Sequence, residues 1–293
     1  MNLMQKEWQE LTLANPTYPS FLKEIHDPPQ PLYLRGELDL TDRVVVAVVG
    51  SRKATAYGRQ AVERIVTPLA EAGIVIVSGL AYGIDAAAHE AALKGGGVTI
   101  GVLGTPIDQI YPVSHRQLGS RMLAAGGAII SEVLAGGEIH RGAFPRRNRI
   151  IAGLSQVVIV VEAALQSGSL ITAGLALAEN RDVLAVPGPI TSPTSAGTNN
   201  LLKLGARPVT EANDVLSLLN LPLLGALTTN PARKPPDEAG TVLLTLLSHS
   251  EPTHIDNLAG RATIDLPILQ GHLTILEIQG YVRMIQPGWY IRL

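Results

Sequence analysis

The sequence predicts an α/β protein whose main domain is a Rossmann-like, doubly wound, mainly parallel sheet. Two observations predict this fold class. Short apolar runs rich in Val and Ile alternate with segments of helical periodicity, which is the pattern of consecutive strand–helix–strand units. Each run is followed by a loop of small or polar residues, as expected where parallel strands end at one edge of a sheet. The runs lie at 44–49, 74–77, 98–103, 128–130, 157–161 and 183–186.

The first forty-two residues precede this alternation, and we expect them to form an N-terminal cap segment on the main domain, which spans 43–222. A short polar helix is expected near the N-terminus and a brief strand at 32–34. Prolines between these two elements interrupt regular structure.

The loop after the first apolar run is Gly50-Ser51-Arg52, and a helix is expected after it, over 57–72. Backbone N–H groups at a tight glycine, the Ser51 hydroxyl and the planar Arg52 guanidinium suit an anion such as a phosphate. No G-x-G-x-x-G follows this strand, and no G-x-x-x-x-G-K-[ST] occurs in the chain. Ordinary dinucleotide enzymes and P-loop ATPases are therefore disfavoured.

Two further loops contain polar groups at predicted helix starts. In SGLAYGIDAAAH, Asp85 is expected to cap a helix and His89 to be its partner on the helix face. Ser167, Gly168 and Ser169 offer hydroxyl and N–H groups to an anion at another helix start, although a capped helix with a tight glycine turn explains them equally well. Histidines and carboxylates do not recur at ligand spacing, so no metal site is expected.

The densest positive cluster is HRGAFPRRNRIIAGLS. Arginines with an interleaved aromatic suit single-stranded nucleic acid, because guanidinium groups follow the backbone and a ring stacks on a base. The other interpretation is a solvated helix start with Phe144 packed inside. The candidate residues of this cluster are Arg141, Phe144, Arg146, Arg147, Asn148 and Arg149.

A linker is expected at 223–240, where Pro, Thr and charged residues show no apolar periodicity, and a winged-helix domain at 241–293. The winged helix is predicted by helices at 241–248, 254–260 and 266–279, followed by a hairpin that turns at Pro287-Gly288. Residues 241–293 contain three arginines and four acidic residues, and the third helix contains no Lys or Arg. Phosphate contacts supply most non-specific DNA affinity, so a protein-contact or regulatory role is favoured for this domain.

The composition of the 293 residues excludes several kinds of site and of protein. The absence of cysteine excludes disulfides, Cys-ligated zinc, iron–sulfur clusters and thiol catalysis. Neither the apolar core of a signal peptide nor a run of ~20 apolar residues is present, so we expect a cytoplasmic protein without a membrane partner. The formal charge of −2 and the pI near 6.4 give no global attraction to nucleic acid. Any such binding requires a local patch.

Seven segments together resemble, in order and spacing, the DNA-processing protein A family (DprA, also called Smf). They are GSRKATAYG, SGLAYGIDAAAH, GVLGTPIDQIYP, FPRRNRIIAGLS, VVEAALQSGSLITA, AVPG and AGTNNLLKLGA. The resemblance covers about 32–219, and the N-terminal lead-in and the winged-helix tail are also similar to that family. Pro106 and His115 depart from the usual pattern.

The resemblance implies a homodimeric, non-catalytic protein without a cofactor that binds single-stranded DNA. It implies that the protein protects incoming DNA and helps to load the RecA recombinase in natural transformation, competence and DNA recombination. Phosphate contact is implied for Gly50, Ser51 and Arg52, base stacking for Phe144, and a further cation for Arg141. The remaining implied backbone contacts are Arg146, Arg147, Asn148 and Arg149, and the implied pairing face contains Leu201, Leu202 and Leu204.

Two alternatives remain open from the sequence. A LOG-type nucleotide-binding or nucleotide-hydrolysing enzyme would place a nucleotide in a polar pocket beside Asp85 and Glu162, but this chain has PGPITSPTSAGT where those enzymes carry PGG-x-GT-x-x-E. A sequence-specific duplex DNA regulator would use the winged helix, which its acidic third helix opposes.

Overall fold

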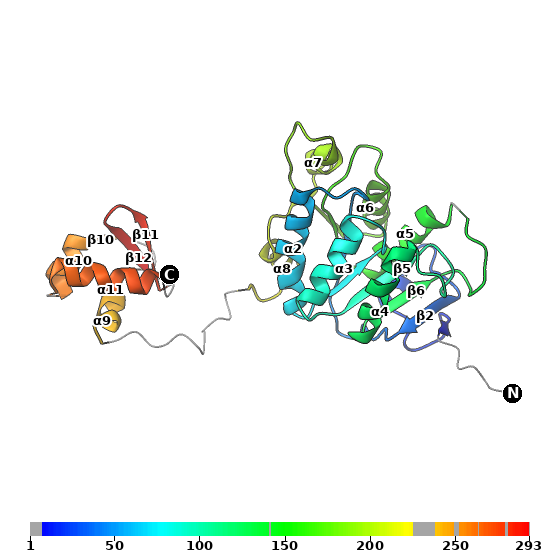
Figure 1. The fold of residues 1–293 in the computed structure, drawn as a ribbon, viewed down its shortest axis with the longest axis horizontal. Helices are drawn as coiled ribbons and strands as arrows, with labels where there is room; N and C mark the ends of the chain where they lie inside the picture. The colour runs from blue at the N-terminus through cyan, green and yellow to red at the C-terminus, as the bar shows by residue number, and fades with distance from the viewer. Residues whose placement is uncertain are drawn as a thin grey trace. The chain divides into compact units, whose positions relative to one another are not determined.

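The computed structural model describes residues 8–140, 142–224, 238–248, 252–262, 264–278 and 281–292. The chain divides into two compact units, Met1–Ala226 and Leu227–Leu293 (Figure 1). The expected linker lies largely outside the described residues, and its last three residues form the start of helix α9 (Glu238–Leu246). Each unit is described by itself.

Within the described residues of the larger unit, nine strands form one sheet in the order β1-β2-β6-β5-β4-β3-β7-β8-β9. The seven strands from β3 to β9 pair in parallel with one another, whereas β2 pairs antiparallel with both β1 and β6, so the predicted mainly parallel sheet is confirmed. The strands are β1 (Gln9–Leu11), β2 (Leu32–Gly36), β3 (Val45–Val49), β4 (Val75–Ser78), β5 (Thr99–Leu103), β6 (Ala128–Ser131), β7 (Val157–Val160), β8 (Asp182–Ala185) and β9 (Arg207–Pro208).

The direction in which strands are added changes at β3. From β3 the chain adds β4, β5 and β6 on one side, then returns to pair β7 with the other side of β3 and adds β8 and β9 beyond it. The loops that follow β3 and β7 therefore diverge at the carboxyl edge. In open α/β sheets a crevice forms at this point.

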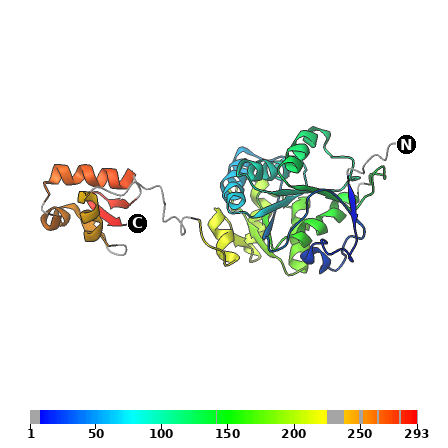
Figure 2. The ribbon, with the colours of Figure 1, turned by 90° about the horizontal axis from the view of Figure 1, so that it is seen from below.

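Helices cover both faces of the sheet (Figure 2). Val46 and Val48 of β3 pack with the helices of one face, and Ala47 and Val49 with those of the other. Burial on both faces is the reason why this strand reads as a continuous apolar run. One face bears α2 (Ala56–Glu71), α3 (Ile84–Lys94), α4 (Arg116–Ala124) and α8 (Ala212–Leu218), and the other bears α1 (Ser20–Lys23), α5 (Ala143–Leu154) and α6 (Gly168–Ala178).

Three short helices complete the larger unit: η1 (Val113–His115), η2 (Pro193–Ser195) and α7 (Ala196–Lys203). The two 3-10 turns precede α4 and α7, and both lie in loops that follow strands.

The N-terminal segment extends the sheet. β2 pairs with β6, and β1 pairs with β2 from Gln9 opposite Leu34 to Leu11 opposite Leu32. The described part of the expected polar helix thus consists of a strand followed by turns, and over these residues the prediction was wrong. Pairing with the exposed edge of β2 and burial of Leu11 outweigh the weak helical preference of so short a segment.

The smaller unit has the predicted winged-helix arrangement. After α9 come α10 (Ile255–Ala262), α11 (Leu266–Ile278) and the hairpin β11 (Val282–Gln286) and β12 (Trp289–Arg292). Gly288 has a positive φ of 80° at the hairpin turn, as the sequence suggested for Pro287-Gly288. The prediction did not include β10 (Thr253–His254), which pairs with β12. Within the ranges that the structure describes, no helix is both long enough and apolar enough to cross a bilayer.

His89 is a core residue of α3 and does not pair with Asp85. Its Nδ1 lies 2.7 Å from the Thr99 hydroxyl oxygen, which itself donates to the Ile76 carbonyl, so Nδ1 must be the donor. Its Nε2 is buried without a partner. Burial, together with the nearby positive groups His115 and Arg147, lowers the pKa of the His89 imidazole to about 3. The imidazole is therefore neutral in the folded protein.

We expect acid to destabilise the larger unit through His89. The pKa is about 3 in the folded state and near 6.5 when the imidazole is solvated. As the pH falls, the imidazole of the unfolded chain therefore takes up a proton before that of the folded chain. The contribution of neutral His89 to the free energy of unfolding is fully present above the unfolded-state pKa, and it is lost as the pH falls toward the folded-state pKa. Between about pH 7.5 and pH 5 the loss is about 2 kcal/mol.

Urea unfolding followed by circular dichroism measures this effect in the wild type and in His89→Gln, whose amide can still donate to Thr99. The variant should show the shallower decline with falling pH. Parallel declines in the two proteins would contradict the assignment.

Candidate nucleic-acid interface

A cleft of about 560 Å³ lies at the carboxyl edge of the sheet, where the strand order reverses. It unites three segments that are far apart in the chain: the β3–α2 loop, the start of α5 and the start of α6. Eight of the predicted site residues line it: Gly50, Arg52, Phe144, Arg147, Asn148, Ser167, Gly168 and Ser169. The sheet reversal thus brings together motifs that the sequence shows only separately.

The β3–α2 loop packs tightly against its surroundings. A side chain at Gly50 would come within 2.7 Å of Ile84 and 3.0 Å of the Glu162 carbonyl, so the loop requires glycine there. The Ser51 N–H donates to that carbonyl over 2.7 Å, and the Ser51 hydroxyl accepts from Lys53 N at 3.1 Å. Ser51 therefore shapes the loop, whereas the exposed Arg52 lines the cleft.

Glu162, two residues after the end of β7, fixes the end of the same loop. Its carboxylate accepts hydrogen bonds from the Thr55 amide at 2.9 Å and from the Thr55 hydroxyl at 2.6 Å, and Thr55 caps α2. Glu162 is 1% exposed, so its carboxylate is committed to this internal role.

Arg147 forms the floor of the cleft. Its Nη1 donates to the carbonyls of Gly79, at 2.8 Å, and Val102, which fastens α5 to the ends of β4 and β5. Burial lowers the pKa of Arg147 to about 10, and the nearby Asp85 opposes that shift, so the guanidinium is charged at neutral pH. A side chain at Gly79 would lie within 2.6 Å of both the guanidinium and the Asp85 carboxylate.

Asp85 also lines the cleft, in the first turn of α3, whose N-cap is Gly83 and not Asp85 as expected. Its carboxylate accepts from the backbone N–H groups of Gly79 and Ala81, because the preceding loop folds back over it. Burial raises the pKa of Asp85, and Arg147 and these hydrogen bonds counteract the rise.

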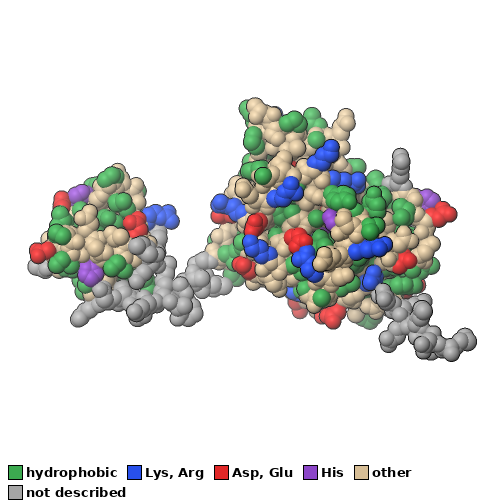
Figure 3. Space-filling model, viewed as in Figure 1, with side chains coloured by type: hydrophobic (Ala, Val, Ile, Leu, Met, Phe, Trp, Pro, Cys, Tyr) green, Lys and Arg blue, Asp and Glu red, His purple; other side chains and the backbone are tan. Residues whose placement is uncertain are grey.

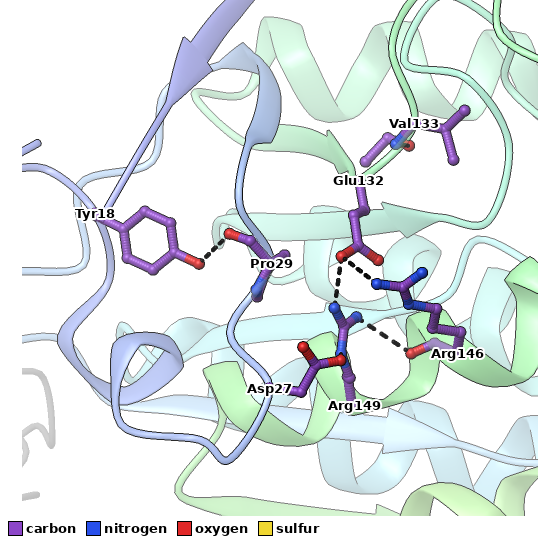
Figure 4. Close-up of polar contacts among 8 residues, drawn as sticks. Tyr18, Asp27, Pro29, Glu132, Val133, Arg146 and Arg149 are labelled. Carbon is purple, nitrogen blue, oxygen red and sulfur yellow. Dashed lines mark hydrogen bonds and ion pairs between the residues drawn. The ribbon is translucent and has the colours of Figure 1, made fainter. Parts of the chain in front are cut away.

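Arg149 is engaged in ion pairs away from the cleft (Figure 4). Its Nε lies 2.8 Å from Asp27 and its Nη2 lies 2.6 Å from Glu132, and its side chain is 10% exposed. Arg146 also contacts Glu132, at 3.2 Å, but is largely exposed. Arg149 therefore joins the N-terminal segment to the loop after β6. Arg141 lies outside the described residues.

The start of α6 forms another wall of the cleft. The Ser167 hydroxyl accepts from the Ser169 N–H at 3.4 Å and caps the helix. Asn148 of α5 donates to the Gly168 carbonyl at 3.4 Å, which ties the two helices together. A helix N-terminus carries partial positive charge and unpaired N–H groups, so this wall favours an anion.

The aromatic part of the cleft contains a residue that the sequence analysis did not select. Phe144 is half-buried, with the Arg52 guanidinium carbon 6.0 Å from its ring centroid. Tyr111 also lines the cleft, and its ring centroid lies 5.9 Å from that of Phe144. The sequence feature that could have identified Tyr111 is an aromatic residue in the polar loop that follows an apolar run, within GVLGTPIDQIYP.

Charges elsewhere on the larger unit are mixed. Figure 3 shows Lys and Arg interspersed with Asp and Glu over the face that bears α2 and α3. Two ion pairs there join Lys94 with Glu63 and Arg121 with Glu90. A uniform basic surface is therefore absent from this face as far as the structure describes it.

The predicted pairing residues lie on and directly after α7, away from the cleft lining. Leu201 and Leu202 are partly buried, and Leu204 is 77% exposed. Asn199 of the same helix exchanges two hydrogen bonds with Gly188, in the loop that contains the 95% exposed Ile190. The exposed Leu204 and Ile190 thus lie in two segments that are joined by these hydrogen bonds.

Comparison with known proteins identifies two matching family models. The model described as DNA recombination-mediator protein A matches residues 9–220, and that of the DprA winged helix domain matches residues 227–285. The chain is 42% identical over 282 residues to protein Smf of Escherichia coli, covering 94% of this chain and 75% of that protein.

Two solved structures are also similar. That of DNA processing protein A from Streptococcus pneumoniae has a TM-score of 0.68 and 44% identity, over 72% of this chain and 74% of that one. DNA processing protein A from Helicobacter pylori, which has a single-stranded DNA binding mode, has a TM-score of 0.65 and 33% identity, over 73% and 96%.

Arg149→Ala should lower the free energy of unfolding by about 3 kcal/mol. This is the lower end of the range for breaking a buried ion pair, because the Asp27 side chain is 59% exposed. Arg146→Ala is the matched control, since it removes an exposed arginine from the same helix and should cost at most about 0.5 kcal/mol. Chemical denaturation of both variants measures the difference, and equal losses would refute the structural role of Arg149.

Proposed function

This chain belongs to the DNA recombination-mediator protein A family, and on that premise we propose that its carboxyl-edge cleft binds single-stranded DNA. One observation carries the proposal: the cleft joins an exposed arginine, a helix N-terminus and an aromatic ring around a single space. Single-strand binding requires this combination of groups for phosphate and for base. The H. pylori relative, which has a single-stranded DNA binding mode, supports the assignment.

Phosphates of the strand are assigned to two polar parts of the cleft lining. Arg52 offers a planar fork of donors, and the start of α6, which lines the same cleft, offers backbone N–H groups. Gly50 also lines the cleft, and it is glycine because a side chain there would collide with Ile84. Arg147 adds a fixed positive charge beneath them, with its donors partly used by carbonyls.

A base is assigned to Phe144, whose half-buried ring forms part of the wall beside Arg52. Stacking on a ring tolerates every base, because each has a π face. Arg146 and Arg149 are not assigned to the strand, since both guanidinium groups are paired with Glu132.

The environments of Asp85 and Glu162, the two carboxylates beside which an enzyme of this fold would hold a nucleotide, support a binding role without catalysis. The Glu162 carboxylate accepts two hydrogen bonds from Thr55, and the Asp85 carboxylate accepts hydrogen bonds from its own loop and lies close to Arg147. Neither carboxylate is thus an accessible base. We propose that the cleft holds DNA without a cofactor and that the protein helps to load the RecA recombinase in natural transformation, with the winged helix making protein contacts.

We further propose a homodimer through the region of α7. Leu204 and Ile190 are among the most exposed large apolar side chains of the described residues. Exposed apolar surface of this kind marks interfaces, and identical patches on two copies pair in a closed dimer.

Arg52→Ala and Phe144→Ala should weaken single-strand binding in different ways. Loss of the Arg52 phosphate contact should reduce the log–log salt slope by ~0.7, because fewer counterions are released. Loss of the Phe144 ring should cost ~1–3 kcal/mol at nearly unchanged slope. Fluorescence anisotropy with a labelled oligonucleotide at several salt concentrations measures both quantities.

Lys53→Ala is the matched charge control, since Lys53 is exposed, adjacent to Arg52 and outside the cleft lining. Its salt slope should stay closer to that of the wild type. Unchanged affinity in folded Arg52→Ala and Phe144→Ala would exclude this site, and turnover of a mononucleotide in a parallel assay would favour the enzyme alternative.

Leu204→Arg should convert a dimer into a folded monomer, because a buried unpaired charge at the interface is costly. Sedimentation velocity at micromolar concentration measures the oligomeric state. Val113→Arg, at an apolar residue 59% exposed on η1, is the control and should remain dimeric. A monomeric wild type would contradict the proposed dimer.

A further inference from the structure

Tyr111 is an exposed aromatic residue in a cleft whose other components were selected from the sequence. Its side chain is 53% exposed although the residue after it, Pro112, is buried. Tyrosine is intermediate among residue types in its burial, so exposure by itself does not indicate a function. Tyr111 is distinguished by its place, because its exposed ring lines the cleft beside Phe144.

The loop that bears Tyr111 is held rigidly. The Thr105 hydroxyl donates to the Gln109 carbonyl at 2.5 Å, and the Ser131 hydroxyl donates to the Thr105 carbonyl at 2.6 Å. Ile107 and Ile110, on either side of the turn, are buried. The ring is thus presented by a preorganised loop, and little conformational entropy remains to be lost when a ligand binds.

The same loop sets the distance between the two cleft rings. A side chain at Gly104, where the loop begins, would lie 2.9 Å from the Phe144 ring, so glycine permits Phe144 to approach. The centroids of Tyr111 and Phe144 are 5.9 Å apart and their planes differ by 55°. Successive bases of a regularly stacked strand are separated by roughly 3.4 Å. Because their planes differ by 55°, the two rings cannot belong to one continuous stack of parallel bases, but each can receive its own base.

We propose that Tyr111 stacks on the base next to the one that Phe144 receives, so that the cleft holds two successive, unstacked nucleotides. The proposal rests on the function assigned above and extends it from one base to a dinucleotide step. Arg52, beside Phe144, then neutralises a phosphate close to this step.

Tyr82 offers a matched control. It is 51% exposed, close to the value for Tyr111, but lines the groove between α2 and α3 with His115, whose ring centroid lies 5.0 Å away. A general effect of removing an exposed tyrosine would appear equally in Tyr82→Ala and Tyr111→Ala.

The test measures binding of the full chain to a short labelled oligothymidylate. Tyr111→Ala should weaken binding by roughly 5- to 140-fold, the ratio that corresponds to one stacked base, with an unchanged salt slope. Tyr111→Phe should bind within about twofold of wild type, because stacking needs the ring and not the hydroxyl. Tyr111→Leu retains an apolar contact with Phe144 but lacks an aromatic face, and it should behave like Tyr111→Ala. Tyr82→Ala should bind like wild type.

Oligonucleotides with one abasic position, moved along the strand, locate the stacked bases. The penalty of Tyr111→Ala should disappear at one abasic position, and that of Phe144→Ala at the neighbouring position. Disappearance of both at the same position would mean that the rings share one base, which would overturn the two-nucleotide site.

The outcomes separate this inference from the function on which it rests. Wild-type affinity in folded Tyr111→Ala and Tyr111→Leu, together with weakened binding by Arg52→Ala and Phe144→Ala, would refute the role of Tyr111 alone. Wild-type affinity in all of these variants would refute single-strand binding in the cleft.

Discussion

The reversal of strand order at β3 is the constraint on which the rest of the structure depends. Because β3 pairs with β4 on one side and β7 on the other, the loops after β3 and β7 diverge at the carboxyl edge. The space between them is the cleft, and α5, which leads into β7, supplies its floor. Gly50 and Gly168 are more than a hundred positions apart in the chain, yet both line the same space.

The edges of this space are set by hydrogen bonds within the protein. Glu162 accepts from both donors of Thr55, and Arg147 donates to two strand-end carbonyls. These buried charged groups fix the β3–α2 loop and the start of α5. A site whose groups are already in position loses less entropy on binding. The most strongly buried ionic groups near the cleft therefore serve its shape, while the exposed Arg52 remains available to a ligand.

The local arrangement of charge reconciles a formal charge of −2 with the proposed binding of a polyanion. The face over α2 and α3 is mixed in sign, and two arginines of α5 are paired with Glu132. In the cleft, Arg52, Arg147 and the positive end of α6 converge, and the carboxylate of Asp85 lies beneath them. A concave site in which positive groups outnumber negative ones attracts an anion even when the whole protein does not.

The sequence by itself determined the features that depend on local pattern. Continuous apolar runs predicted the parallel strands, because a strand covered on both faces has no polar side, and helical periodicity followed by a Pro-Gly turn predicted the winged helix. The tertiary structure alone decided which side chains meet. Arg149 pairs with Asp27, which is 122 positions away, and Tyr111 reaches Phe144 from a separate loop. Periodicity reports which face of an element is buried, whereas the partner of a charge or a ring is decided by the packing of distant segments.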